Sequence, residues 1–159
     1  MKFSDNTVQP KPLYTPAQRK RRNQSRWTFV QGVLAPVQFL VFLVSAALLT
    51  RYLLTGEGFA LAAASVAIKT LFLYAIMYTG ALWEHDVYGQ YLFAPAFYWE
   101  DMVSMVVIAL HTLYIALYLF DISSQQTLAW VAVAAYVTYV INAAQFVLKL
   151  RQARMAEQH

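Results

Sequence analysis

Long apolar stretches separated by short polar connections dominate this chain. Four such stretches occur, at residues 27–54, 59–83, 97–120 and 128–150. Each exceeds the roughly 20 residues that a helix needs to cross the hydrocarbon core of a bilayer. The connections hold the Gly, Asp, Ser and Pro residues that interrupt helices. The pattern predicts an all-α integral membrane bundle of four transmembrane helices, forming one transmembrane domain over 27–150.

The basic residues gather near the two ends of the chain. Ten of the twelve Lys and Arg residues fall in 1–26 or 149–159, and only Arg51 and Lys69 lie between. Basic segments that flank spans stay in the cytoplasm. We therefore expect an N-in, C-in topology, with 1–26 as a cytoplasmic basic arm and 151–159 as a cytoplasmic tail. The first apolar stretch is too long for a cleavable signal peptide.

Composition supports the membrane interpretation and narrows the chemistry. Hydrophobic residues make up 60% of the chain and charged residues 13%, against about 25% charged residues in average soluble domains. The basic residues that give the net charge of +4 lie next to apolar helices. Contact with a membrane surface explains this position better than binding of nucleic acid does. With no cysteine, disulfides, thiolate metal sites and cysteine nucleophiles are excluded.

Polar side chains form a stripe along the first span and another along the fourth. The stripes consist of Gln31, Gln38 and Ser45, and of Thr138, Asn142, Gln145 and Lys149. We expect most of them to form interhelical hydrogen bonds, with substrate contact as the alternative. Small residues in LAAASVA (61–67) and WVAVAAYV (130–137) predict close helix packing. Pro36 predicts a kink, which either widens a pocket or is tolerated without a function.

Ionisable residues cluster where the second and third spans face each other. Residues 80–105 contain Glu84, His85, Asp86, Glu100 and Asp101. An ionisable side chain inside a bilayer costs at least about 2.5 kcal/mol, so this cluster favours a functional role. The alternatives are solvated loop acids and charges that complement a helix dipole.

Two further ionisable residues lie deeper in the spans. His111 shares a helical face with Glu100 but lies roughly 16 Å further along the axis, so the two would line a groove. His111 is either a hydrogen-bonded bundle residue, an axial ligand of a tetrapyrrole metal or a proton-transfer group. Lys69 needs a carboxylate, a carbonyl or an anion, unless its side chain reaches the interface.

Aromatic residues accompany the acidic cluster between the second and third spans. They are Tyr91, Phe93, Phe97, Tyr98 and Trp99. Such a group is typical of an interfacial belt or of a stacking surface for a planar ligand.

Several long motifs occur in a fixed order along the chain. They are LYTPAQRKRR (13–22), WTFVQGVLAPVQFLVFLVS (27–45), RYLLTGEG (51–58), the 80–105 cluster, ALHTLY (109–114) and YVINAAQFVLKLR (139–151). Through these motifs the chain resembles the 3-vinyl bacteriochlorophyllide hydratase family over residues 13–151. The resemblance implies a hydro-lyase of bacteriochlorophyll synthesis in the inner membrane of phototrophic bacteria. Such an enzyme adds water to the C3 vinyl group of chlorophyllide a and forms the 3-(1-hydroxyethyl) product.

Vinyl hydration requires an acid, a group that positions water and an apolar site for the macrocycle. Protonation of the terminal vinyl carbon leaves a cation that the conjugated ring delocalises, and water attacks the carbon next to the ring. A carboxylic acid in an apolar site can keep its proton near neutrality. We expect Glu100 to act as the acid and Asp101 or Glu84 to hold the water.

The remaining candidates are assigned to substrate binding. They are His111, His85, Lys69, Asn142, Trp99 and Tyr98. We expect His111 or His85 to be the axial ligand of the substrate magnesium, and Lys69 or the Arg19 to Arg26 arm to bind the propionate. No cofactor is expected beyond the magnesium that the substrate carries.

The expected partners are chlorophyllide and the lipid bilayer, without nucleic acid. Homo-oligomers and contacts with other bacteriochlorophyll-synthesis enzymes stay open. A noncatalytic pigment-binding or pigment-delivery protein is the main alternative, and it would also need histidines and aromatic residues. It would not need clustered carboxylates. A small transporter is a third alternative, which would move a substrate without changing it.

Overall fold

The computed structural model describes residues 12–158, and long helices make up most of that range. They are α2 (Arg26–Thr55), α3 (Phe59–Tyr88), α4 (Tyr98–Leu119) and α5 (Gln125–Glu157), with a short helix α1 (Pro16–Gln24) before them and a single 3-10 turn η1 (Pro95–Phe97) before α4. Each of the four long helices is long and apolar enough to cross a membrane, where the third candidate span consists of η1 and α4 together. The expected all-α fold with four long apolar helices is thus confirmed. Residues 1–11 of the expected arm lie outside the described residues.

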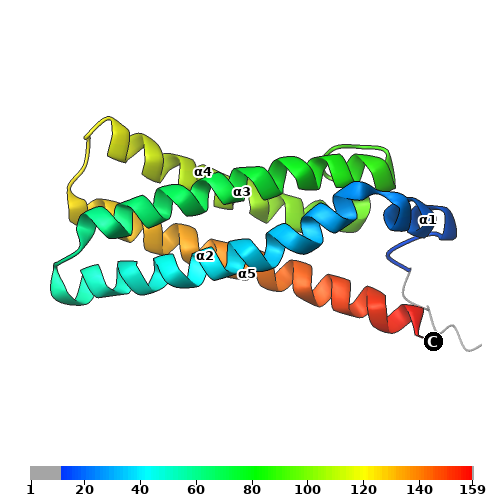
Figure 1. Ribbon diagram of the computed structural model, residues 1–159. Coiled ribbons are helices and arrows are strands. Elements are labelled where there is room, and N and C mark those ends of the chain that lie inside the picture. Colours follow the sequence, from blue (N-terminus) through cyan, green and yellow to red (C-terminus); the bar gives the residue numbers. More distant parts are fainter. Residues whose placement is uncertain (1–11, 159) are drawn as a thin grey trace, which may run out of the picture.

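The four long helices form two helical hairpins (Figure 1). α2 packs along α3, and α4 packs along α5, while contacts between the hairpins are sparser. Gly56 and Gly58 make the tight turn between α2 and α3, where their φ values of 72° and 82° suit glycine. The α3–α4 connection, α1 and the end of α5 lie at one end of the bundle, which we call the terminal end.

Helix α1 was not expected within the basic arm. Thr15 caps it, because the Thr15 hydroxyl accepts from the Gln18 N–H at 3.2 Å and the Gln18 side chain accepts from the Thr15 N–H at 2.8 Å. Pro16 occupies the first turn, where its missing N–H is harmless. The Thr-Pro-x-Gln sequence is a known helix-start signal, so this helix was detectable.

Two spans are longer helices than the apolar pattern indicated. α3 continues from the expected end at 83 to Tyr88, and α5 continues through residues 151–157 of the expected tail. Polar residues extend these helices because α1 and the terminal end of the bundle provide partners, such as Glu157 for Arg22 at 2.9 Å.

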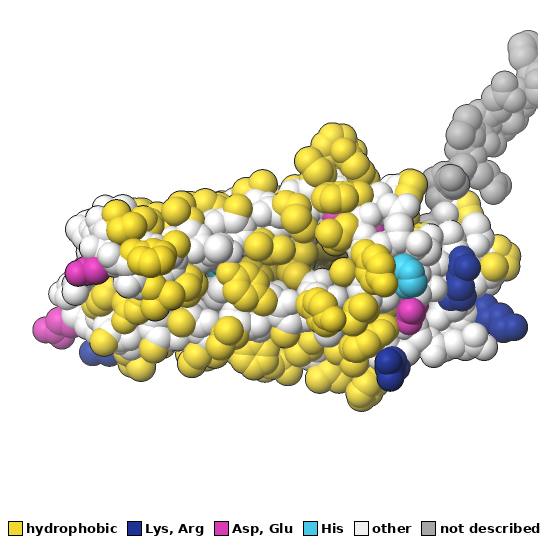
Figure 2. All heavy atoms as spheres, turned by 90° about the horizontal axis from the view of Figure 1, so that it is seen from above, with side chains coloured by type: hydrophobic (Ala, Val, Ile, Leu, Met, Phe, Trp, Pro, Cys, Tyr) yellow, Lys and Arg dark blue, Asp and Glu magenta, His cyan; other side chains and the backbone are white. Residues whose placement is uncertain are grey.

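The hydrophobic core fills the half of the bundle away from the terminal end. Small side chains are buried there, namely Ala62, Ala63, Ala129, Ala132 and Ala135. They let the helix backbones approach closely, as the sequence predicted. Outside this core, hydrophobic side chains cover the length of the bundle and charged side chains gather near its ends (Figure 2).

Candidate functional site

A cavity of about 1010 Å³ lies between the two hairpins, in the half of the bundle near the terminal end. We call it the interhairpin cavity. α2, α3 and α5 supply most of its wall, and small residues such as Gly32, Ala35 and Gly80 leave it open. Pro36 also lines it, and α2 bends along its path in Figure 1. Pro36 thus lies where a kink could widen the cavity, and the widening itself stays a prediction.

The interhairpin cavity opens sideways between α2 and α5. Three apolar residues of its wall, Phe39, Val140 and Val147, are 46%, 46% and 63% exposed. They belong to the hydrophobic outer surface of the bundle. The opening therefore faces the region that lipid would occupy.

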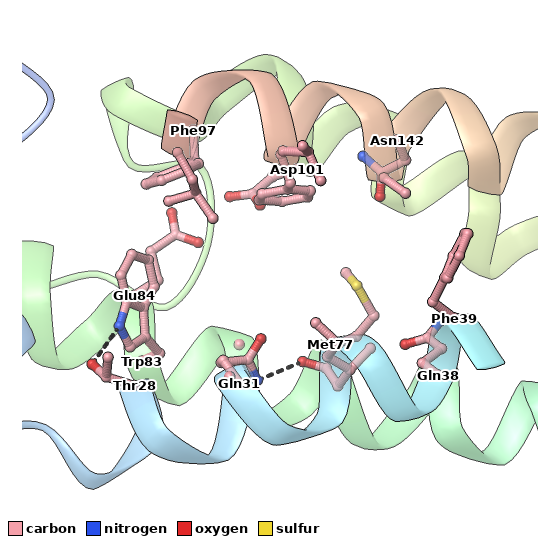
Figure 3. A pocket seen from close by; sticks show the side chains of 18 of the residues that line it. Thr28, Gln31, Gln38, Phe39, Met77, Trp83, Glu84, Phe97, Asp101 and Asn142 are labelled. Atoms are coloured by element: carbon pink, nitrogen blue, oxygen red, sulfur yellow. Dashed lines mark hydrogen bonds between the residues drawn. The ribbon is translucent and has the colours of Figure 1, made fainter. Parts of the chain in front are cut away.

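Two carboxyl groups meet in the wall of the cavity. Glu84 from α3 and Asp101 from α4 are each 4% exposed and point toward one another (Figure 3). Two buried carboxyl groups that face each other disfavour a negative charge on both at once. We therefore expect the acid pair of Glu84 and Asp101 to hold one proton between its members.

The connection between α3 and α4 fixes the orientation of the acid pair. Ala94 N–H donates to Glu84 Oε1 at 2.7 Å, and Phe93 N–H donates to Asp101 Oδ2 at 2.9 Å. Phe93 has a φ of 61°, a left-handed conformation that is strained for a bulky residue. Backbone strain of this kind is often found at functional sites, where the surrounding structure maintains it.

Glu100, the residue expected to be the acid, lies outside the cavity wall. Its Oε1 forms an ion pair with Lys149 Nζ at 2.8 Å, and Lys149 also donates to the Ala96 carbonyl. The Glu100 carbonyl accepts from Asn142 Nδ2 at 2.9 Å. These contacts tie α4 to α5, so the structure brings Glu84 and Asp101 together on the cavity and pairs Glu100 with Lys149, while Glu100 Oε2 is buried without a hydrogen-bond partner within residues 12–158.

His111 and Lys69 form a buried pair away from the cavity wall. Lys69 Nζ lies 3.1 Å from His111 Nε2, and His111 Nδ1 lies 2.8 Å from the Val107 carbonyl oxygen. Because that carbonyl can only accept, Nδ1 carries the proton and Nε2 accepts from Lys69. Neither nitrogen is free for magnesium, which removes the basis for expecting His111 as the axial ligand. His111 does share a buried face with Glu100, as expected.

The environment of Lys69 differs from both expected ones. The ammonium lies 3.6 Å from the centre of the Tyr139 ring, and the side chain is fully buried. It neither reaches the interface nor lines the cavity, so it is not placed to bind a propionate. Cation–π contact and His111 stabilise it instead.

Three other residues expected to contact the substrate, namely His85, Tyr98 and Trp99, do not line the cavity. His85 is exposed and stacks on Tyr91 with ring centres 4.2 Å apart. Tyr98 and Trp99 face outward at 43% and 70% exposure, as an interfacial belt would, and all of these residues lie outside the cavity wall. Phe97, one position earlier, lines the cavity in their place.

Asn142 does line the cavity, as expected of a substrate contact. Its amide is already used, because Nδ2 donates to the Glu100 carbonyl and Oδ1 accepts from Ser104 at 2.9 Å. Asn142 therefore belongs to the contacts between α4 and α5.

Gln31 and Gln38 line the cavity, and Gln31 also forms the interhelical hydrogen bonds that the sequence predicted. Gln31 Nε2 donates to Thr79 Oγ1 at 2.6 Å and to the Ile76 carbonyl at 3.2 Å. The carbonyl of Ile76 can only accept, so Gln31 Oε1 points into the cavity (Figure 3). Both glutamines belong with Ser45 to the polar stripe of the first span, and Ser45 forms the expected interhelical bond to Tyr136.

Two cations line the cavity toward the terminal end. They are Arg22 of α1 and Arg154 of α5. Arg22 is paired with Glu157. Arg22 lies within the basic arm for which binding of an anion was expected.

Comparisons with known proteins agree with one another. A family model described as 2-vinyl bacteriochlorophyllide hydratase matches residues 14–152. A protein of Cereibacter sphaeroides with the same description is 59% identical over 143 residues, which is 90% of this chain and 89% of that protein. One of Rhodobacter capsulatus, again so described, is 58% identical over 146 residues, covering 91% and 84% of the two chains. No solved structure matches.

Proposed function

Because the chain belongs to the 2-vinyl bacteriochlorophyllide hydratase family, we propose that its interhairpin cavity binds chlorophyllide a and hydrates the vinyl group. The vinyl position numbered 2 in the family description is C3 in the systematic numbering of the ring. The protein is thus a hydro-lyase of bacteriochlorophyll synthesis. The observation that carries the assignment of the site is the acid pair in the wall of an otherwise largely apolar cavity.

The acid pair can complete a hydration cycle without another cofactor. Its protonated member donates to the terminal vinyl carbon, and the positive charge is delocalised into the macrocycle. Water then attacks the carbon attached to the ring and gives a proton to the pair, while the oxygen remains as the new hydroxyl. The pair loses one proton and regains one, so it returns to its starting state.

The backbone of the α3–α4 connection supports this proton transfer. The N–H groups of Phe93 and Ala94 each bind one carboxyl oxygen of the pair. They hold the two acids in place and leave their remaining oxygens for the shared proton and for water. Positioning of this kind is an established source of rate enhancement.

The propionate of the substrate fits the cations at the terminal end of the cavity. Arg154 can form bidentate, charge-assisted hydrogen bonds with a carboxylate. Arg22 adds positive charge beside it, while its guanidinium nitrogens donate to Asn23 and Glu157. We therefore move the expected propionate contact from Lys69 to these two arginines.

We assign the axial contact with the substrate magnesium to Gln31. Magnesium prefers oxygen ligands, and Gln31 Oε1 points into the cavity because its amide nitrogen is bound to α3. A neutral amide also adds no net charge to an apolar site. His85 and His111, which were expected in this role, lie outside the wall or have both nitrogens occupied.

Gln31→Leu should weaken binding of the magnesium pigment by about tenfold, which corresponds to 1.4 kcal/mol. It should leave the affinity for the magnesium-free analogue nearly unchanged, because only the magnesium pigment can use the ligand. Fluorescence titration of both pigments measures the two dissociation constants. Equal losses for the two pigments would contradict the assignment and indicate a packing role.

The proposed activity is tested with purified protein and 3-vinyl chlorophyllide in buffer without additives. Loss of vinyl conjugation shifts the red absorption band to shorter wavelength, and the extracted pigment should have gained one water. A pigment-binding protein would shift the band without forming a new extractable pigment. A transporter would move pigment across liposomes unchanged.

The proposed topology places both termini and the α3–α4 connection in the cytoplasm, in a bacterial inner membrane. The basic residues of α1 and the end of α5 support this orientation. A topology reporter inserted at Glu57, in the turn between α2 and α3, should read as noncytoplasmic, and one fused after the C-terminus should read as cytoplasmic. A cytoplasmic reading at Glu57 would overturn the orientation.

A further inference from the structure

Gln38 is a buried amide that faces the interhairpin cavity without a partner. Its side chain is 2% exposed, and neither Oε1 nor Nε2 has a hydrogen-bond partner within residues 12–158. Burial of an unsatisfied amide is unfavourable. A bound molecule that supplies a hydrogen-bonding group at this point would remove that penalty, so Gln38 indicates a polar contact with the ligand.

The position of Gln38 indicates which part of a ligand it would meet. Gln38 and Glu84 lie toward opposite ends of the cavity in Figure 3, with Gln31 between them. Gln31 and Gln38 are seven residues apart on α2, or roughly 10 Å along the axis. A macrocycle whose vinyl group reaches the acid pair and whose magnesium lies near Gln31 would direct its opposite side to Gln38.

The chemistry of that opposite side fits an amide donor. In chlorophyllide a, the fifth ring lies across the macrocycle from the vinyl group, and it carries a conjugated keto oxygen and a methyl ester. Both are hydrogen-bond acceptors. The propionate is the other polar substituent, and as an anion it suits the cations Arg22 and Arg154 of the cavity wall better than the neutral amide of Gln38.

We propose that Gln38 Nε2 donates a hydrogen bond to the keto oxygen of the fifth ring and thereby selects the orientation that brings the vinyl group to the acid pair. This role rests on the proposed function, because it takes chlorophyllide as the ligand. Gln38 touches the substrate away from the reacting carbons, so it is a binding and specificity residue.

The test compares pigments that differ only in the acceptor. Dissociation constants are measured for chlorophyllide a, for its analogue with the keto oxygen removed, and for its analogue without the methyl ester. The native protein should bind the analogue without the keto oxygen about tenfold more weakly, a difference of 1.4 kcal/mol. In Gln38→Leu the affinities for chlorophyllide a and for the analogue without the keto oxygen should become nearly equal. Loss of the methyl ester should change the affinity little in either protein.

Gln31→Leu is the matched control, since it removes the same amide one heptad earlier in the same cavity wall. Gln31→Leu should lower the affinity for chlorophyllide a and for the analogue without the keto oxygen. It should leave unchanged the preference for the pigment that carries the keto oxygen. A keto preference that persists in Gln38→Leu would overturn the proposal and leave an ordered water as the partner of Gln38. A preference for the ester-bearing pigment that disappears in Gln38→Leu would overturn it in favour of the ester carbonyl.

A vibrational measurement on the native complex gives a test that needs no variant. A hydrogen bond lowers the stretching frequency of the keto group, so the bound pigment should show a lower frequency than pigment in an aprotic solvent. An unshifted frequency would overturn the proposal. Because both tests measure binding, absence of a hydrated product would contradict the proposed function without affecting them.

Discussion

Glu84→Gln and Asp101→Asn are each expected to lower the turnover number by about 10² or more, the scale for loss of a general acid or base. Pigment affinity should change only slightly, because each amide keeps the shape of the acid. Each amide also keeps an oxygen that can accept from Ala94 or Phe93 of the connection. Turnover is measured from the blue shift of the red band, and affinity by fluorescence titration.

Glu100→Gln is the matched control for these two variants. Glu100 is adjacent to Asp101 in sequence but pairs with Lys149 outside the cavity wall. We expect this change to lower resistance to unfolding in detergent and to leave the turnover number near its native value. If Glu100→Gln abolished hydration while Glu84→Gln and Asp101→Asn remained active, the acid would have to be Glu100, as the sequence first suggested.

Gly80→Leu is expected to lower pigment affinity by roughly 10²-fold, or about 2.7 kcal/mol. Gly80 lines the cavity, and a Cβ atom there would lie 3.4 Å from Gln31 Oε1. That space admits an alanine, but the longer branches of leucine would occupy the volume proposed for the macrocycle. Titration with chlorophyllide measures the loss, and circular dichroism verifies that the helices remain.

Two further variants separate cavity filling from a general effect of the substitution. Gly80→Ala should reduce the affinity far less than Gly80→Leu. Ala75→Leu adds a larger side chain at an exposed position of the same helix, outside the cavity wall, and should leave the affinity unchanged. Native affinity in Gly80→Leu would contradict the placement of the pigment in this cavity.

The spans were predictable because a helix in lipid needs only an apolar surface of sufficient length. The acidic cluster was also found, since carboxylates between two spans stand out against such a surface. The choice among the carboxylates was not predictable. Adjacent helical residues differ by about 100° in direction, so Glu100 and Asp101 face different neighbours, and only the packing assigns Lys149 to one and Glu84 to the other.

The histidine assignment depended on a contact between distant parts of the chain. Lys69 and His111 are 42 residues apart, and each looked available for a ligand when considered alone. Their contact with each other uses the amine of Lys69 and the Nε2 atom of His111. The seven-residue spacing of Gln31 and Gln38 placed them on one face and favoured interhelical hydrogen bonds. Gln31 forms such bonds and Gln38 does not, a difference that the spacing did not predict.

The sideways opening between α2 and α5 has a consequence for how the enzyme should be assayed and how it obtains its substrate. A pigment that approaches through this opening comes from the hydrocarbon phase, so the quantity that governs occupancy is its mole fraction in the bilayer. Adding pigment-free lipid at constant total pigment would then slow hydration by surface dilution. For the same reason, pigment could pass between this protein and other membrane enzymes by lateral diffusion, without crossing water.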